Sequence, residues 1–229
     1  MKFHKNLILF IVLIVMSQNM HAVVRIVCSA ALTDNFFEFR KKQYICSFEK
    51  IIELGYPAFY VVEAIRKKGP TFLENYSKHI FYATVNNPNL RNNGINEAKT
   101  LLEGCRHFNF EPDDMIVKLT GRHSFISDYL IKLVENNPDI DAFVKANEDG
   151  NIWTVGFAMR YKHFKEMFET IDYDFIERNM IPLEYKVGDY IKKKKKENNF
   201  KVFYLDKLDI KAELYGSSTC PGVNDITVF

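Results

Sequence analysis

Residues 23–64, VVRIVCSAALTDNFFEFRKKQYICSFEKIIELGYPAFYVVEA, contain the pattern that decides the fold. Val23 to Ser29 is an apolar run of strand length, and apolar residues then recur at helical spacing from Phe36 to Leu54. Gly55-Tyr56-Pro57 ends that helix, and Ala58 to Ala64 forms a second strand. A strand, a helix and a second strand in this order indicate a parallel pair joined by a helix.

The same alternation continues through the rest of the chain. Further strands are predicted over 80–85, 115–119, 142–146, 153–161 and 201–205, and further helices over 95–105, 124–135, 163–179 and 183–196. Strands that alternate with helices build a mostly parallel sheet that is covered on both faces. We therefore predict an α/β protein, a three-layer α/β/α sandwich, with residues 23–229 in a single domain.

Residues 1–22 have the layout of a secretory signal peptide. Lys2 and Lys5 precede an unbroken apolar run from Leu7 to Met16, and the small residue Ala22 ends the segment. The run is shorter than the roughly 20 residues that a membrane-spanning helix needs. We expect cleavage after Ala22 and entry into the secretory pathway, as an exported, periplasmic or lumenal protein. Contact with a membrane is expected only if the leader stays attached as an anchor.

The charge balance excludes a general polyanion binder. Lysine and arginine together number 31 against 29 acidic residues, and Lys2 and Lys5 of the leader account for that excess. Binding to nucleic acid depends on a basic surface, so we expect no nucleic-acid partner. A small ligand that carries phosphate remains open. The five lysines at 192–196 are interpreted as the solvated end of a helix, whose dipole they complement.

The cysteine pattern leaves two interpretations. Cys28, Cys46, Cys105 and Cys220 allow three disulfide pairings in an oxidising compartment, and their spacings fit no zinc motif. The alternative is free thiols, because Cys28 and Cys105 lie in apolar patterns that predict positions in a core.

The most informative polar cluster is KLTGR at residues 118–122. In an open parallel sheet, ligands bind beyond the carboxyl ends of the strands, and this cluster follows a predicted strand. Lys118 and Thr120 share one face, and Gly121 allows a tight turn before Arg122. An ammonium, a hydroxyl and a guanidinium suit phosphate oxygens. The alternative is that both cations pair with nearby acids such as Asp113 or Asp114.

A second cluster, NNGINEA at residues 92–98, is an asparagine-rich turn that opens a helix. The N–H groups of a first helical turn attract anions, whereas the alternative is an ordinary helix cap. The sequence contains no GxGxxG after the first strand, no P-loop, no GxSxG and no HExxH. The commonest motifs of dinucleotide-fold oxidoreductases, P-loop enzymes, hydrolases and zinc proteases are therefore absent from it.

The order of elements, the NNGINEA segment and the KLTGR strand end resemble glycosyltransferase-like proteins with the GT-A fold. The similarity extends from Val24 to about Gly216 and includes GFAMRY at 156–161 and IPLEY at 181–185. It implies a Rossmann-related, GT-A-like fold and transfer of a sugar from a nucleotide-diphosphate-sugar donor to a glycan or other acceptor. A catalytically inactive protein that binds sugar nucleotides or glycans is the alternative.

The resemblance also bears on metals. In many GT-A enzymes the end of the fourth strand bears a DxD pair that binds a divalent cation, whereas here Lys118-Leu119-Thr120 stands in its place. A lysine cannot ligate a cation, so we expect no cofactor, and the alternative is Mn²⁺ or Mg²⁺ bound without a DxD pair.

Residue roles follow from the same resemblance. Ser29 and Ala30 would line the nucleoside pocket, and Glu63 would accept a hydrogen bond from base or ribose. Glu184 would be the general base, and Arg160 would lie near the acceptor. The groups expected to hold the diphosphate are Asn93, Gly94, Lys118, Thr120 and Arg122, and Gly121 is a further expected substrate-binding residue. A third hypothesis, prompted by 20 phenylalanines and 12 tyrosines, is an interaction protein with an aromatic surface.

Overall fold

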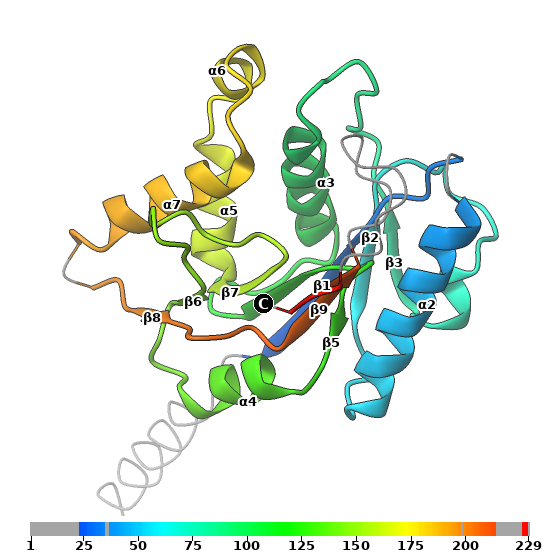
Figure 1. Ribbon diagram of the computed structural model, residues 1–229, viewed down its shortest axis with the longest axis horizontal. Helices are drawn as coiled ribbons and strands as arrows, with labels where there is room; N and C mark the ends of the chain where they lie inside the picture. The colour runs from blue at the N-terminus through cyan, green and yellow to red at the C-terminus, as the bar shows by residue number, and fades with distance from the viewer. Residues whose placement is uncertain (1–22, 35–36, 198, 214–225, 229) are drawn as a thin grey trace, which may run out of the picture.

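The computed structural model of the protein describes residues 23–34, 37–197, 199–213 and 226–228 (Figure 1). The predicted signal peptide and Cys220 lie outside the described residues. The central sheet has the strand order β3-β2-β1-β4-β7-β6-β8. Its strands are β1 (Val24–Ala30), β2 (Tyr60–Glu63), β3 (His79–Tyr82), β4 (Met115–Thr120), β6 (Ala142–Val144), β7 (Gly156–Arg160) and β8 (Val202–Tyr204).

The sheet is mixed but mostly parallel, as the sequence predicts. Strand β1 runs parallel to both β2 and β4, β2 runs parallel to β3, and β6 runs parallel to β8. Strand β7 is antiparallel to β4 and to β6. The α/β class is therefore confirmed, with one strand reversed.

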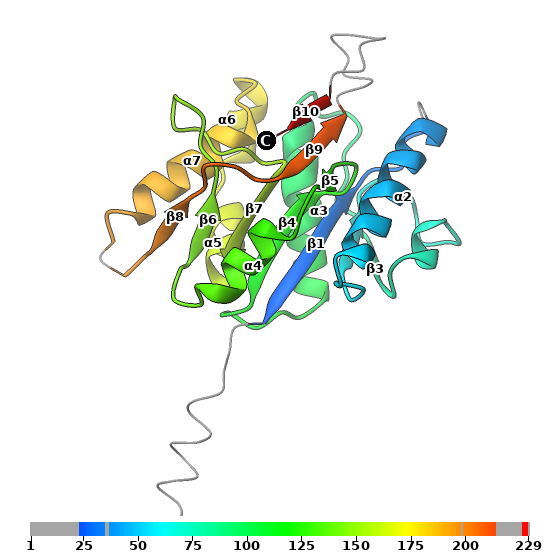
Figure 2. The same cartoon turned by 60° about the horizontal axis from the view of Figure 1, so that its bottom comes forward.

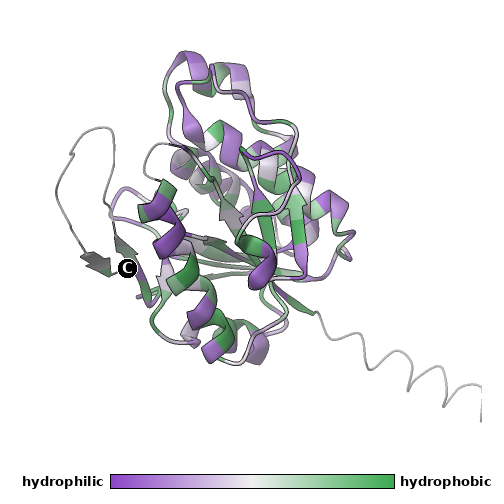
Figure 3. Cartoon of the chain, turned by 90° about the vertical axis from the view of Figure 1, so that its right-hand side faces the viewer, coloured by the Kyte–Doolittle hydropathy of each residue, from purple (hydrophilic) through white to green (hydrophobic). Residues whose placement is uncertain are grey.

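Helices pack on both faces of this sheet (Figures 1 and 3). They are α2 (Phe37–Glu53), α3 (Asn93–His107), α4 (Tyr129–Asn136), α5 (Tyr161–Glu169), α6 (Tyr173–Arg178) and α7 (Leu183–Lys194), and a short 3₁₀ turn spans Leu73–Asn75. No helix among the described residues is both long and apolar enough to cross a membrane.

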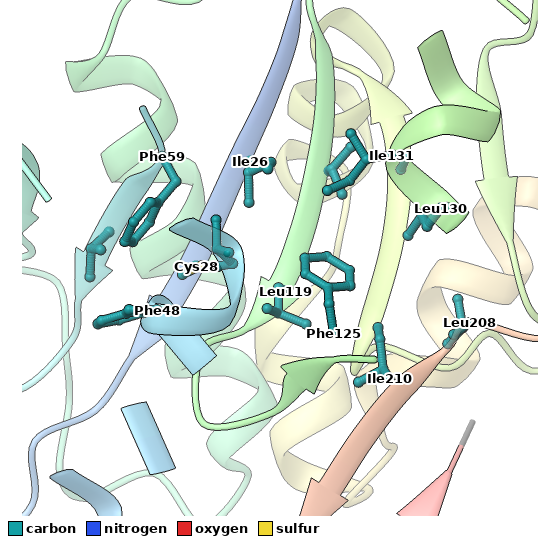
Figure 4. Packing of buried hydrophobic residues seen from close by; sticks show 14 of the residues in the cluster. Ile26, Cys28, Phe48, Phe59, Leu119, Phe125, Leu130, Ile131, Leu208 and Ile210 are labelled. Atoms are coloured by element: carbon teal, nitrogen blue, oxygen red, sulfur yellow. The ribbon is translucent and has the colours of Figure 1, made fainter. Parts of the chain in front are cut away.

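Alternating residues of the strands divide the core in two. Ile26 and Cys28 of β1 belong to a cluster that includes residues of α2 and α4, part of which is shown in Figure 4. Val27, between them, belongs to a second cluster with residues of α3, α5 and α7. Side chains alternate between the faces of a strand, so α2 and α3 cover opposite faces.

A small second sheet of order β10-β9-β5 is formed by β5 (Ser124–Phe125), β9 (Ile210–Glu213) and β10 (Ile226–Val228) (Figure 2). Residues 124–125, predicted as the start of a helix, pair instead with β9. The helix predicted over 163–179 is two helices, because Asp172 caps α6 by accepting a hydrogen bond from the Phe175 N–H at 2.9 Å.

Three of the four cysteines are free thiols in the structure. Cys28 and Cys105 are buried free thiols in the core, as their apolar surroundings predict, and Cys46 is an exposed free thiol on α2. The lysine-rich segment ends α7, and Lys192, Lys193, Lys195 and Lys196 are exposed there.

Candidate functional site

A pocket of about 270 Å³ lies at the carboxyl ends of β1 and β4. The chain leaves β1 through α2 toward β2, and it reaches β4 through α3, which covers the opposite face. The connections diverge at this point, where open α/β sheets bind their ligands. Five predicted site residues line the pocket: Ser29, Ala30, Asn93, Thr120 and Arg122.

Two guanidinium groups give this pocket positive charge. Arg122 follows β4 and is half-buried, and Arg40 reaches the pocket from α2. Neither forms an ion pair within the described ranges, although Arg40 Nη1 donates to the Ala31 carbonyl at 3.4 Å. Burial lowers the pKa of the Arg122 guanidinium, and Arg40 adds to this effect despite the opposing influence of Tyr44. An anion in the pocket would stabilise both cations.

Lys118 does not reach the pocket, which corrects its predicted role in holding a diphosphate. It does share a face with Thr120, but α3 covers that face, so only 1% of its side chain is exposed. Its Nζ lies 2.8 Å from Glu97 Oε1, donates to Thr120 Oγ1 at 2.8 Å and also donates to the Thr154 carbonyl. The cation does pair with an acid, but the acid comes from α3 rather than from residues 113–114.

Glu97 is a site residue that sequence reasoning assigned no role. Its Oε1 accepts hydrogen bonds from Ser29 Oγ at 2.8 Å and Thr120 Oγ1 at 3.3 Å, in addition to the ion pair with Lys118. Burial acts to raise the pKa of this carboxyl, but the charge and hydrogen bond of Lys118, with the two hydroxyls, bring it below its usual range. Glu97 therefore stays ionised.

Glu63 does not line the pocket, so the structure does not place it at its predicted contact with a base or a ribose. The residue is 0% exposed, and its Oε1 accepts the backbone N–H groups of Leu32, Ile65 and Arg66 at 3.1, 2.8 and 2.9 Å. Burial raises the pKa of this carboxyl. Glu63 therefore ties the loop after β1 to the loop after β2 and shapes one wall of the pocket.

Gly121 is required by a close approach of two backbones. Its N–H donates to the Ser29 carbonyl at 2.8 Å, and a Cβ at this position would lie 2.8 Å from that same oxygen. The register pairs Ser29 with Thr120, so the two strand ends stay side by side as they enter the pocket. Gly121 thus has a structural role at the site.

A second pocket, of about 360 Å³, adjoins the first and contains Glu184. Glu184 lies in the first turn of α7, is half-buried and accepts a hydrogen bond from Thr154 Oγ1 at 2.6 Å. Gly94 lines this pocket rather than the first, and a Cβ there would lie 3.0 Å from Leu183 Cβ. Asn93 and Glu97 line both pockets.

Arg160 lies at the other end of the strands from both pockets, which differs from its predicted place near an acceptor. It pairs in register with Met115, the first residue of β4, because β7 runs antiparallel. Its Nε forms an ion pair with Asp141 Oδ1 at 2.9 Å, and its Nη1 donates to the Asp113 carbonyl at 3.2 Å. Arg160 therefore fastens the far ends of the strands.

The donor set at the β4 end does not fit a divalent cation. The Lys118 ammonium donates to Thr120 where a metal ligand would be needed, and no three histidine, cysteine or acidic side chains of the described ranges come together as a metal site.

A scan against models of known protein families finds no match, and a search of curated proteins finds no relative.

Proposed function

We propose that the protein binds a nucleotide-diphosphate sugar in the pocket between β1 and β4 and transfers the sugar to a glycan or another hydroxyl-bearing acceptor. A GT-A-like, three-layer arrangement of the domain is part of this proposal. The observation that carries it is the pair Arg40 and Arg122, two guanidinium groups without a carboxylate partner among the described residues, at the ligand-binding end of the sheet.

The size of the site supports a ligand of this class. Pockets for drug-sized ligands enclose roughly 300–1,000 Å³, so the first pocket alone, at about 270 Å³, is small. The adjoining pocket adds about 360 Å³ and continues from the shared residues Asn93 and Glu97. Donor and acceptor would therefore occupy neighbouring compartments of one binding surface.

The transfer step would proceed without a metal at the diphosphate. The acceptor oxygen forms a bond to the anomeric carbon while the bond from that carbon to the diphosphate oxygen breaks. The leaving diphosphate takes the electron pair, and Arg40 and Arg122 stabilise its charge. Glu184, in the second pocket, accepts the acceptor proton.

Ligand binding tests the site. UDP, GDP and ADP, each alone and as its glucose or mannose conjugate, are titrated calorimetrically into the protein in the presence of EDTA. At least one nucleoside diphosphate should bind, and Arg122→Gln and Arg40→Gln should each weaken it about tenfold, because a charged hydrogen bond is lost. Arg106→Gln, an exposed position at the far end of α3, is the matched control. Failure of all these nucleotides to bind would refute the proposal.

The inactive binding protein is the second candidate, and one observation favours it. Lys118, which pairs with Glu97, stands in the place of the first carboxylate of the DxD pair that the GT-A resemblance implies. Release of nucleoside diphosphate from the bound donor, measured with and without acceptor sugars, separates the two. Tight binding with no release under any condition would identify the non-catalytic protein.

A further inference from the structure

One ionised carboxylate lies at the junction of the two pockets. Among their lining residues that the structure describes, Asn93 and Glu97 alone belong to both, and only Glu97 carries charge. Glu97 retains 25% side-chain exposure despite its ion pair with the buried Lys118. The exposed part of this carboxylate is therefore available to whatever spans the two pockets.

The two carboxylate oxygens of Glu97 differ in their contacts. The ammonium of Lys118 and the hydroxyls of Ser29 and Thr120 all meet Oε1. None of the hydrogen bonds that described residues make to this carboxylate uses Oε2. An anchored oxygen beside an open one gives a carboxylate that is fixed in orientation and still able to accept a hydrogen bond from a ligand.

Arg40 and Glu97 enter the first pocket from opposite faces of the sheet, and the charge of Glu97 also acts on Arg122. Arg40 comes from α2, on one face of the sheet, and Arg122 also lines a third pocket against that helix. Glu97 comes from α3, on the other face, and opens into the second pocket. A ligand whose phosphates meet Arg40 and Arg122 would therefore place a neighbouring group beside Glu97.

We propose that Glu97 binds the sugar of the donor and holds it at the junction with the acceptor pocket. This rests on the proposed function and adds the position and orientation of the sugar. Carboxylate oxygens accept hydrogen bonds from sugar hydroxyls, and the amide groups of Asn93 and Asn96 stand nearby in the same pocket. A fixed negative charge also stabilises the positive charge that develops at the anomeric carbon during glycosyl transfer.

Glu97 is distinct in role from Glu184. Its depressed pKa makes it a weak base, so the proton of the acceptor passes to Glu184, which has a hydroxyl rather than an ammonium as its partner. Lys118 is a positioning residue, because it acts on the sugar only through Glu97.

The test compares each nucleotide sugar with its own nucleoside diphosphate. UDP against UDP-glucose and GDP against GDP-mannose are titrated into the wild type and into Glu97→Gln. The variant should keep its affinity for the nucleoside diphosphate within about twofold and lose about five- to tenfold in affinity for the sugar conjugate. Any turnover should fall about a hundredfold. Glu103→Gln, further along α3 and outside both pockets, should change neither.

Glu97→Gln leaves the buried ammonium of Lys118 without its counter-ion and could fail to fold. The double variant Glu97→Gln/Lys118→Met removes both charges, so it should fold and still lack the preference for the sugar. Lys118→Met alone should keep that preference at pH 7.5 and lose it on acidification, because the pKa of Glu97 then rises. A double variant with wild-type preference would overturn the inference. Absence of all nucleotide binding to the wild type would instead refute the proposed function.

Discussion

The buried ammonium of Lys118 connects several segments that surround the pocket. An uncompensated charge in a protein interior costs several kcal/mol, so Lys118 requires acceptors. Glu97, Thr120 and the Thr154 carbonyl supply them from three different segments of the chain. A single residue thereby joins α3, β4 and the segment before β7 beside the site.

His123, directly after the proposed phosphate-binding arginine, gives the protein a pH-dependent stability. It is 2% exposed, and burial, with the charges of Arg122 and Lys118, lowers its pKa from about 6.5 to about 3. Below pH 6.5 this histidine is protonated in the unfolded chain but stays neutral in the folded protein. The free energy of unfolding therefore falls on acidification, and it continues to fall down to about pH 3.

Replacement of this histidine should remove that loss. Acidification from pH 6.5 to pH 5 should lower the free energy of unfolding of the wild type by about 1.5 kcal/mol more than that of His123→Leu. Urea unfolding at each pH measures this difference. Some pH dependence will remain, because burial also lowers the pKa of His163. His79→Gln, at an exposed position, is the matched control. Equal slopes for His123→Leu and the wild type would contradict the prediction.

At the scale of elements, the sequence predicts most helices and strands because their periodicity is local. The segments predicted over 23–29, 36–54 and 115–119 match β1, α2 and β4 within a residue or two. The direction of a strand has no such local signature. Strand β7 is found at its predicted place but runs antiparallel, and this reversal moves Arg160 to the wrong end of the sheet.

The parts of the site that could not be predicted depend on partners far apart in sequence. Lys118 meets a carboxylate from a different element, so its burial is invisible in the KLTGR motif itself. Arg40 lies within an ordinary amphipathic helix and lines the pocket because the first turn of α2 lies beside it. The two-residue strand β5 exists because it pairs with β9, more than 80 residues later.

Helix α3 can approach the sheet closely only because Gly104 has no side chain. A Cβ at this position would lie 2.3 Å from Val62 Cγ2 on β2, well inside contact distance. Gly104→Ala should therefore destabilise the protein by about 1–3 kcal/mol through overpacking. In an isolated helix the same change would stabilise by about 1 kcal/mol, so the sign separates packing from helix propensity.

Urea unfolding measures this effect, and Gly69→Ala provides the comparison. At Gly69 an added Cβ would meet only the Lys67 carbonyl, at 3.8 Å, so the change in stability should stay within about 0.5 kcal/mol. Because Gly104 faces β2 behind the pocket, its variant should also weaken nucleoside diphosphate binding if α3 shifts outward. A stabilised Gly104→Ala variant would show that α3 is free to move.

At the scale of the whole molecule, the sheet keeps the two core clusters apart. Cys28 belongs to the cluster under α2, and Cys105 belongs to the cluster under α3. A disulfide needs Cβ atoms about 4 Å apart, and a strand layer between two thiols prevents this. Cys28 and Cys105 therefore cannot pair with each other in the folded protein, even in an oxidising compartment.

Thiol labelling of the intact fold tests this arrangement. Burial raises the pKa of both the Cys28 and the Cys105 thiol, which suppresses the reactive thiolate, and the core excludes the reagent as well. In the variant Cys46→Ser/Cys220→Ser, purified without reductant, Ellman's reagent should find no reactive thiol in native buffer and two in 6 M guanidinium chloride. Cys46 restored alone should react within minutes in the native state. Fewer than two thiols after unfolding would mean that Cys28 and Cys105 are oxidised, and the two clusters could not then lie on opposite faces of the sheet.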